Sequence, residues 1–115
     1  MKKFTSTLFI IFLIFSAKAL AADNDMVIRI SEGEESAKIT IIAYESLTCG
    51  HCANFHKDVL PELKKDFIDK GLVKIEFRHF PLDLAAFNAS KIAQCNNDGN
   101  SNILHILYSG QKKMG

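Results

Sequence analysis

Residues 38–80 follow a strand–helix–strand pattern, which limits the folds open to this chain more than any other feature. Residues 38–44 form a nearly continuous apolar run rich in β-branched side chains, as is typical of a strand buried on both faces of a sheet. Residues 72–80 alternate between apolar and charged side chains, which predicts a second strand. One face of that strand would carry Val73, Ile75, Phe77 and His79. Because parallel strands joined by a helix form a right-handed crossover, the chain is predicted to be an α/β protein.

The segment between these strands is predicted to be an amphipathic helix that ends at Lys70-Gly71. Pro61 lies inside this helix. Because proline lacks a backbone N–H and its ring clashes with the carbonyl group of Lys57, we expect a kink there. The apolar stripe of the helix would consist of Phe55, Val59, Leu60, Leu63, Phe67 and Ile68.

Shorter elements are predicted on both sides of this unit. Residues 26–30 predict a short strand, and residues 82–94 a second helix with an apolar stripe around Leu84 and Phe87. A run of Asn, Asp and Gly then breaks that helix, and residues 103–112 predict a third one. The expected order is therefore β-β-α-β-α-α.

Residues 1–21 carry the features of a cleavable secretory signal peptide. Two lysines precede an unbroken apolar run over residues 8–15, and small residues permit cleavage after Ala19 or Ala21. The run is far shorter than the roughly 20 residues that span a bilayer, so no membrane span is expected after cleavage; the alternative is an uncleaved anchor. Residues 22–115 would then form the mature domain, located in the periplasm or secreted.

Charge and composition exclude some classes of protein. The chain carries 14 Lys and Arg against 13 Asp and Glu, and its formal charge of +1 becomes −2 once the three lysines of the signal leave. The sequence has no basic stripe of the kind that nucleic-acid binders carry, so no nucleic-acid partner is expected. Apolar residues make up 48% of the chain, which is typical of a folded domain and not of a disordered one.

Two cysteines, Cys49 and Cys52, lie where the first long strand gives way to the helix. A helix N-terminus presents unpaired N–H groups and a partial positive charge, which stabilise a thiolate, and His51 can add to this effect. Cys52 comes one helical turn later, placed to attack a mixed disulfide formed at Cys49. This spacing at a strand-to-helix junction of an exported chain indicates redox chemistry. The predicted catalytic residues are therefore Cys49, Cys52 and His51, with a reversible Cys49–Cys52 disulfide.

Three segments of the chain resemble DsbA-like thiol–disulfide oxidoreductases of the thioredoxin superfamily. Residues 44–55 resemble the active-site segment of that family, residues 59–63 the kinked continuation of its first helix, and residues 78–83 the end of its next strand. The central pair Gly50-His51 also matches the dipeptide of protein disulfide isomerases, whereas many DsbA-like proteins have a proline before the histidine.

The resemblance implies a partial thioredoxin-like fold, β-β-α-β, running into the start of a helical insertion, which residues 83–115 would form. It also implies an enzyme: a protein-disulfide oxidoreductase that forms or reshuffles disulfides in exported proteins without a cofactor. Its substrates would be the thiols and disulfides of those proteins, and a separate redox partner would recycle it. The family's cis-proline loop is not matched by Pro61, inside a helix, or by Pro81, at a strand end. The chain is thus similar to the N-terminal portion of such a protein.

Two alternatives remain open at this point. The first is a truncated, largely inactive fragment of such an enzyme. The second is an exported metal-binding module that uses Cys49, Cys52 and His56, although a closed zinc site usually has four ligands. His56 is otherwise expected on the helix surface, and no metal site is predicted for the oxidoreductase.

Four further residues carry weaker expectations. Glu45 is expected to be a solvated residue at a strand end, the alternative being a buried acid that relays protons for Cys52. His79 is expected to be packed and hydrogen-bonded in the core, and His105 to be structural. Cys95 is expected to be a buried, inert thiol on the second helix. Its alternative is a disulfide with another segment or a second chain.

Overall fold

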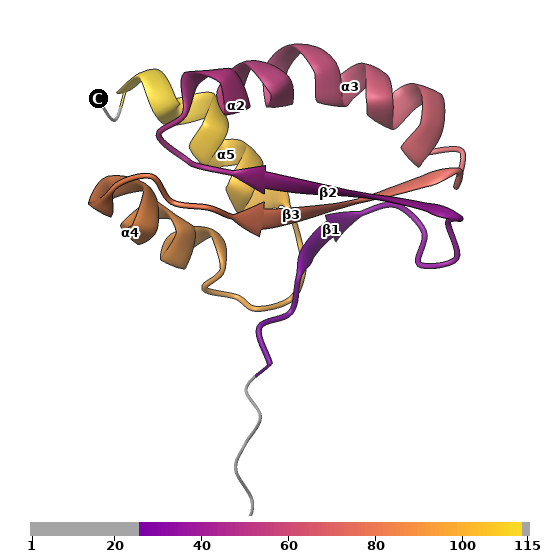
Figure 1. The fold of residues 1–115 in the computed structure, drawn as a ribbon, viewed down its shortest axis with the longest axis horizontal. Coiled ribbons are helices and arrows are strands. Elements are labelled where there is room, and N and C mark those ends of the chain that lie inside the picture. Colours follow the sequence, from indigo (N-terminus) through magenta and orange to yellow (C-terminus); the bar gives the residue numbers. More distant parts are fainter. Residues whose placement is uncertain (1–25, 114–115) are drawn as a thin grey trace, which may run out of the picture.

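A computed structural model describes residues 26–113, in which three strands form one sheet and the helices pack around it (Figure 1). The strands are β1 (Ile30–Glu32), β2 (Ile39–Glu45) and β3 (Val73–His79), in the spatial order β1-β3-β2. β2 runs parallel to β3, from Ile39 opposite Val73 to Glu45 opposite His79, and β1 runs antiparallel to β3. The α/β class and the parallel crossover are confirmed, and the predicted signal peptide lies outside the described residues.

The central strand β3 supplies much of the core. Val73, Ile75 and Phe77 are buried, as their alternation predicts, and Ile75 is fully enclosed. The other fully enclosed large side chains are Ile30, Leu47 and Leu104, which come from β1, the loop after β2 and the last α-helix. Through Leu47, the loop that leads into the cysteine motif is anchored in this core.

The first strand begins later than predicted. The expected strand over residues 26–30 is wrong, because β1 starts only at Ile30 and the preceding residues are exposed. The backbone N–H of Ile28 donates to Asn97 Oδ1 at 2.7 Å, and its carbonyl oxygen accepts from Gln94 Nε2 at 2.8 Å. Side chains distant in sequence therefore satisfy this backbone in place of a neighbouring strand.

β2 is an edge strand, and only one of its faces is covered. Ile39, Ile42 and Tyr44 have exposed fractions of 58%, 44% and 62%, so the prediction of a strand buried on both faces is wrong for the described chain. Ile41 and Ala43 face the core from the side opposite Ile42 and Tyr44. Ile39 is on the same side as Ile41 but is exposed at the start of the strand. The apolar run therefore correctly predicts a strand, but only one face of that strand is buried.

The helix after β2 is divided by two π-helical turns. It consists of α2 (Gly50–Asn54), η2 (Phe55–Val59), α3 (Leu60–Leu63) and η3 (Lys64–Ile68), which run along the top of the sheet in Figure 1. Leu60 N–H donates five residues back to the Phe55 carbonyl group, and Pro61 follows in the first turn of α3. The irregularity expected at Pro61 is therefore a widened turn ahead of the ring.

The widened turns also change which side chains are buried. Each π turn contains one residue more than an α-helical turn. The side chains that follow it are therefore rotated about the helix axis relative to those of a regular α-helix. Leu60 and Ile68 are buried as predicted, but Val59 and Phe67 have exposed fractions of 52% and 46%. The predicted stripe is therefore only partly correct.

Two further helices follow β3: α4 (Leu84–Ala93) and α5 (Asn102–Gly110), with a short 3₁₀ turn, η4 (Gln111–Lys113). The predicted element order is confirmed. The predicted stripe of α4 is wrong, since Leu84 and Phe87 are exposed and the small residues Ala86, Ser90 and Ala93 are buried. No helix between residues 26 and 113 is long and apolar enough to cross a membrane.

Candidate active site

Cys49 occupies the N-cap position of α2. Its φ and ψ of −80° and 115° are extended, and its Sγ accepts a hydrogen bond from the backbone N–H of Cys52 at 3.4 Å. Its backbone N–H donates to the Ser46 carbonyl group at 3.0 Å, and its own carbonyl group accepts from Ala53 at 3.1 Å. The first turn of the helix therefore directs a free N–H group at the sulfur, as an N-cap side chain requires.

The two thiols of the motif have opposite pKa shifts. Hydrogen bonds from the Cys52 thiol, from its backbone N–H and from that of His51 lower the pKa of Cys49. Burial, followed by the neighbouring Cys49 sulfur, raises the pKa of Cys52. Cys49 thus ionises first, which is the asymmetry that thiol–disulfide exchange uses.

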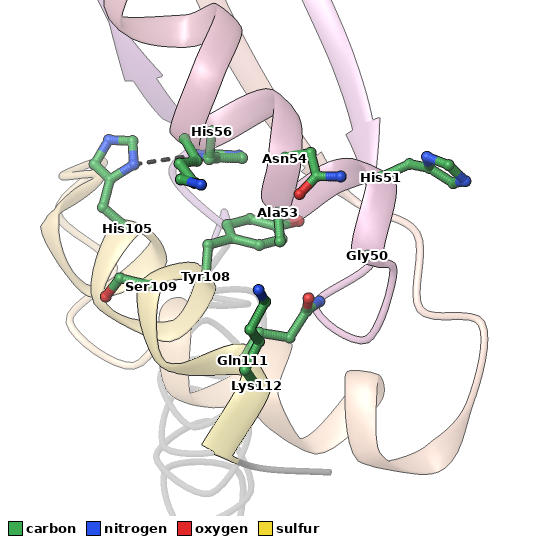
Figure 2. Close-up of a pocket in the computed structure, with 11 residues that line it drawn as sticks. Gly50, His51, Ala53, Asn54, His56, His105, Tyr108, Ser109, Gln111 and Lys112 are labelled. Atoms are coloured by element: carbon green, nitrogen blue, oxygen red, sulfur yellow. Dashed lines mark hydrogen bonds between the residues drawn. The ribbon is translucent and has the colours of Figure 1, made fainter.

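The His51 imidazole is exposed and points away from the other labelled side chains in Figure 2. After the larger contributions of Cys52, His51 lowers the pKa of Cys49 through its backbone N–H and not through its ring. A contribution of the imidazole to catalysis therefore stays a prediction.

Residues that the sequence did not single out hold the loop before α2. Thr48 Oγ1 donates to Asp83 Oδ2 at 2.7 Å, and Asp83 Oδ1 caps α4 by accepting from the Ala86 N–H at 2.7 Å. Gln111 Nε2 donates to the carbonyl groups of Leu47 and Cys49 at 2.9 and 3.1 Å. An acid before a helix is a recognisable capping signal, whereas nothing local to Gln111 indicates its role.

Glu45 and His56 form a buried pair, so two expectations are wrong. Glu45 has an exposed fraction of 7%, and its Oε2 lies 2.7 Å from Nε2 of His56, whose side chain is 4% exposed. The imidazole stacks on Tyr108 with ring centroids 4.0 Å apart and packs against Phe77. Glu45 is therefore not a solvated strand end, and His56 is not a surface residue.

His105, on α5, continues this arrangement. Its Nδ1 lies 3.2 Å from Nδ1 of His56, and its Nε2 lies 2.5 Å from Oε1 of Glu32 on β1. The hydrogen bond from His105 is the largest cause that lowers the pKa of Glu32 to about 2. His105 was expected to be structural, and its partners lie 49 and 73 residues away in the sequence.

A pocket of about 970 Å³ opens between α2 and α5. Figure 2 shows Tyr108 at its centre, with His56 and His105 side by side beyond it and Gln111 on the opposite wall. Burial, then the negative charge of Glu45, raises the pKa of Tyr108. The pocket therefore brings solvent to His105, whose side chain is 34% exposed, while the side chain of His56 is only 4% exposed.

The remaining predicted residues lie elsewhere. His79 is half-buried, but its Nε2 makes no hydrogen bond within residues 26–113, so the expected hydrogen bond is wrong; burial lowers its pKa. Cys95 follows the end of α4 and is exposed, so the buried, helical placement is also wrong. The three cysteines of the described chain are free thiols.

The metal-binding alternative finds no support in the described part of the chain. Between residues 26 and 113, no three His, Cys, Asp or Glu side chains are grouped so that they could hold a metal ion. The two ring nitrogens of His56 contact Glu45 and His105, so neither is directed at a metal ion shared with Cys49 and Cys52.

The sequence matches the thioredoxin family over residues 23–115. The chain belongs to that family. The crystal structure of Wolbachia pipientis alpha-DsbA1 superimposes with a TM-score of 0.69 at 32% identity, covering 76% of this chain and 45% of that one. The oxidised BdbD of Bacillus subtilis superimposes with a TM-score of 0.61 at 27% identity, covering 72% of this chain and 48% of that one. The partial thioredoxin-like fold of the DsbA type is thus confirmed.

Curated relatives point the same way. A Rickettsia bellii protein named "Putative protein-disulfide oxidoreductase" is 38% identical over 93 residues, covering 79% of this chain and 34% of the relative. The chain therefore spans about a third of the length of that relative and less than half of either solved structure.

Proposed function

We propose that this chain is a protein-disulfide oxidoreductase that exchanges thiols and disulfides through Cys49 and Cys52. The observation that carries the proposal is the N-cap position of Cys49, whose sulfur accepts the Cys52 N–H at 3.4 Å. The lowered pKa of Cys49 and the raised pKa of Cys52 support separate roles as nucleophile and resolving thiol. The names of its relatives, which are disulfide oxidoreductases, support the same reaction class.

The proposed reaction has two steps. The Cys49 thiolate attacks a substrate disulfide, forms a mixed disulfide and releases one substrate thiolate. Cys52 then loses its proton and attacks Cys49 Sγ, which releases the second substrate thiolate and leaves a Cys49–Cys52 disulfide. The reverse sequence oxidises a substrate dithiol. We assign the proton of Cys52 to buried Glu45, whose charge already acts on that thiol.

The proposal extends to location and partners. The features of residues 1–21 support export to the periplasm or secretion, where a disulfide persists. Residues 22–115 would be the exported domain, with residues 83–115 as its helical insertion. The substrates would be thiols and disulfides of exported proteins, and a separate redox partner would recycle the pair. His51 is proposed to stabilise the Cys49 thiolate from the exposed rim.

The proposal is tested with three serine variants in an insulin-reduction assay driven by dithiothreitol. Cys49→Ser is expected to abolish turnover, and Cys52→Ser to accumulate a mixed disulfide at Cys49 that mass spectrometry detects. Cys95→Ser is the matched control, because Cys95 is an exposed thiol that lies outside the motif. The proposal is wrong if Cys49→Ser keeps the turnover of the unchanged chain, or if Cys95→Ser loses it.

A further inference from the structure

Four side chains from four different elements form one continuous line behind the cysteine motif. Glu45 of β2 contacts His56 of η2 at 2.7 Å, His56 contacts His105 of α5 at 3.2 Å, and His105 contacts Glu32 of β1 at 2.5 Å. Figure 2 shows the central contact between the two histidines as a dashed line. We call these four residues the relay line.

The contacts of the relay line determine how many protons it holds. Each contact joins two atoms that cannot both accept, so each needs one proton, and three contacts need three protons. If Glu45 is protonated, it donates to His56 Nε2, His56 Nδ1 donates to His105, and His105 Nε2 donates to Glu32. If Glu45 is ionised, the same three protons leave one histidine doubly protonated. Both arrangements carry one net negative charge, and protons that shift along their own hydrogen bonds interconvert them.

The two ends of the relay line lie in different surroundings. At the inner end, Glu45 is buried, and its negative charge adds to the raised pKa of Cys52 and opposes the lowering of the pKa of Cys49. At the outer end, the His105 side chain is 34% exposed and lines the pocket. His56, between them, is 4% exposed. The line thus starts at a buried acid that contacts His56, four residues after Cys52 on the same helix, and ends at a histidine that solvent reaches.

Other titratable groups surround the line. Tyr108 stacks on His56, and His79 lies within the influence of the Glu45 charge. Lys64 Nζ lies 3.5 Å from Glu32 Oε2, and Lys57 and Lys112 line the pocket. His56 and His105 each carry two ring nitrogens, so each can take up a proton at one nitrogen and release one at the other.

We propose that His56 and His105 conduct protons between Glu45 and solvent, and so supply or remove the proton of Cys52 during disulfide exchange. The inference rests on the proposed function. When Cys52 attacks Cys49 Sγ, its proton passes to Glu45 and an equivalent proton leaves at His105. When a substrate thiolate attacks the Cys49–Cys52 disulfide at Cys49, the departing Cys52 thiolate takes its proton from Glu45, which is refilled through the histidines. His56 and His105 are positioning residues, since they act on Cys52 through Glu45.

The test separates the two chemical steps with the disulfide DTNB on the reduced, full chain carrying Cys95→Ser, because the exposed Cys95 would otherwise react. Attack by Cys49 releases the first nitrothiobenzoate in a second-order phase. Attack by Cys52 on the resulting mixed disulfide releases the second in a first-order phase. The first phase reports the proposed function, and the second reports deprotonation of Cys52.

His105→Gln is the test variant, because Gln keeps a donor near Glu32 but cannot pass a proton. The second phase near pH 6–7 is expected to slow by about tenfold or more, while the first phase stays within about twofold. The expected slowing is smaller than the roughly 10²–10⁴-fold of a direct acid–base group, because His105 acts through Glu45. Imidazole, small enough for the pocket, is expected to restore the second phase, which a structural defect would not allow. Ser109→Ala, in the same pocket wall but outside the relay line, is the matched control.

The outcomes are distinct. A second phase in His105→Gln that matches the background at every pH between about 5 and 8, or a slow phase that imidazole does not restore, overturns the relay. Slowing of equal size in Ser109→Ala also overturns it. If His105→Gln does not fold, as judged by circular dichroism, His105→Asn is measured against the same criteria. Absence of either phase in the Cys95→Ser background refutes the proposed function itself, independently of the relay.

Discussion

Glu32 provides a pH-dependent stabilisation that can be measured. Its Oε1 lies 2.5 Å from His105 Nε2, and its Oε2 lies 3.5 Å from Lys64 Nζ. The hydrogen bond from His105, the largest cause, holds the pKa of Glu32 at about 2 instead of 4.5. Because the folded-state pKa is the lower one, the stabilisation is complete above about pH 4.5 and is lost as the pH falls toward about 2. At 1.36 kcal/mol per pKa unit, its size is about 3 kcal/mol.

Glu32→Gln removes this titrating carboxyl group. Urea unfolding midpoints, converted to free energies of unfolding, are measured between about pH 5 and about pH 2 for the chain and the variant. The unchanged chain is expected to lose about 3 kcal/mol more than the variant over this range. Glu34→Gln is the control, since Glu34 is exposed on the turn after β1 and should leave the pH dependence as it is. Parallel curves for Glu32→Gln and the unchanged chain would refute the argument.

Three further predictions concern the motif and the sheet edge. Iodoacetamide below neutral pH should alkylate Cys49 before Cys52 and Cys95, because its lowered pKa leaves more thiolate; peptide mass spectrometry that finds Cys95 modified first would contradict this. His51→Ala should make the Cys49–Cys52 pair less oxidising, by about 30 mV for each 1.4 kcal/mol of thiolate stabilisation lost. An unchanged equilibrium constant with glutathione would show that the His51 ring does not stabilise the Cys49 thiolate. Circular dichroism of the chain without residues 1–21 should show a broad unfolding transition at low temperature, because Ile42 and its neighbours are exposed along β2. A sharp transition above about 55 °C would contradict this prediction of low stability.

Local patterns were sufficient to predict the elements and their order. The alternation in β3 places Val73, Ile75 and Phe77 in the core as the sequence predicts, and the cysteine motif lies at the start of a helix. The start of β1 could not be predicted, since Gln94 and Asn97 provide the hydrogen bonds that replace a strand partner. The exposed face of β2 is equally invisible in its own sequence, because burial depends on which elements cover it.

The surroundings of the cysteines were predicted less completely than the cysteines themselves. The N-cap geometry of Cys49 follows from a local junction. Gln111, which holds the carbonyl groups of Leu47 and Cys49, comes from the far end of the described chain. His105 meets Glu32 across 73 residues. Such contacts depend on how α5 packs against the sheet, which no short sequence window specifies.

The burial of His56 and Glu45, by contrast, follows from periodicity once the correct face is chosen. Cys52, His56 and Leu60 recur at four-residue spacing and face the core. The predicted stripe included Leu60 but left out His56 and took in Val59, which is exposed. A histidine between two inward-facing residues needs a buried polar partner, because an unpaired polar group there is costly. The covered face of β2 ends in an acid, Glu45, which fills that need at 2.7 Å. Two facing apolar surfaces, each interrupted by one complementary polar residue, therefore predict a buried pair, and the pair marks the inner end of the proposed relay.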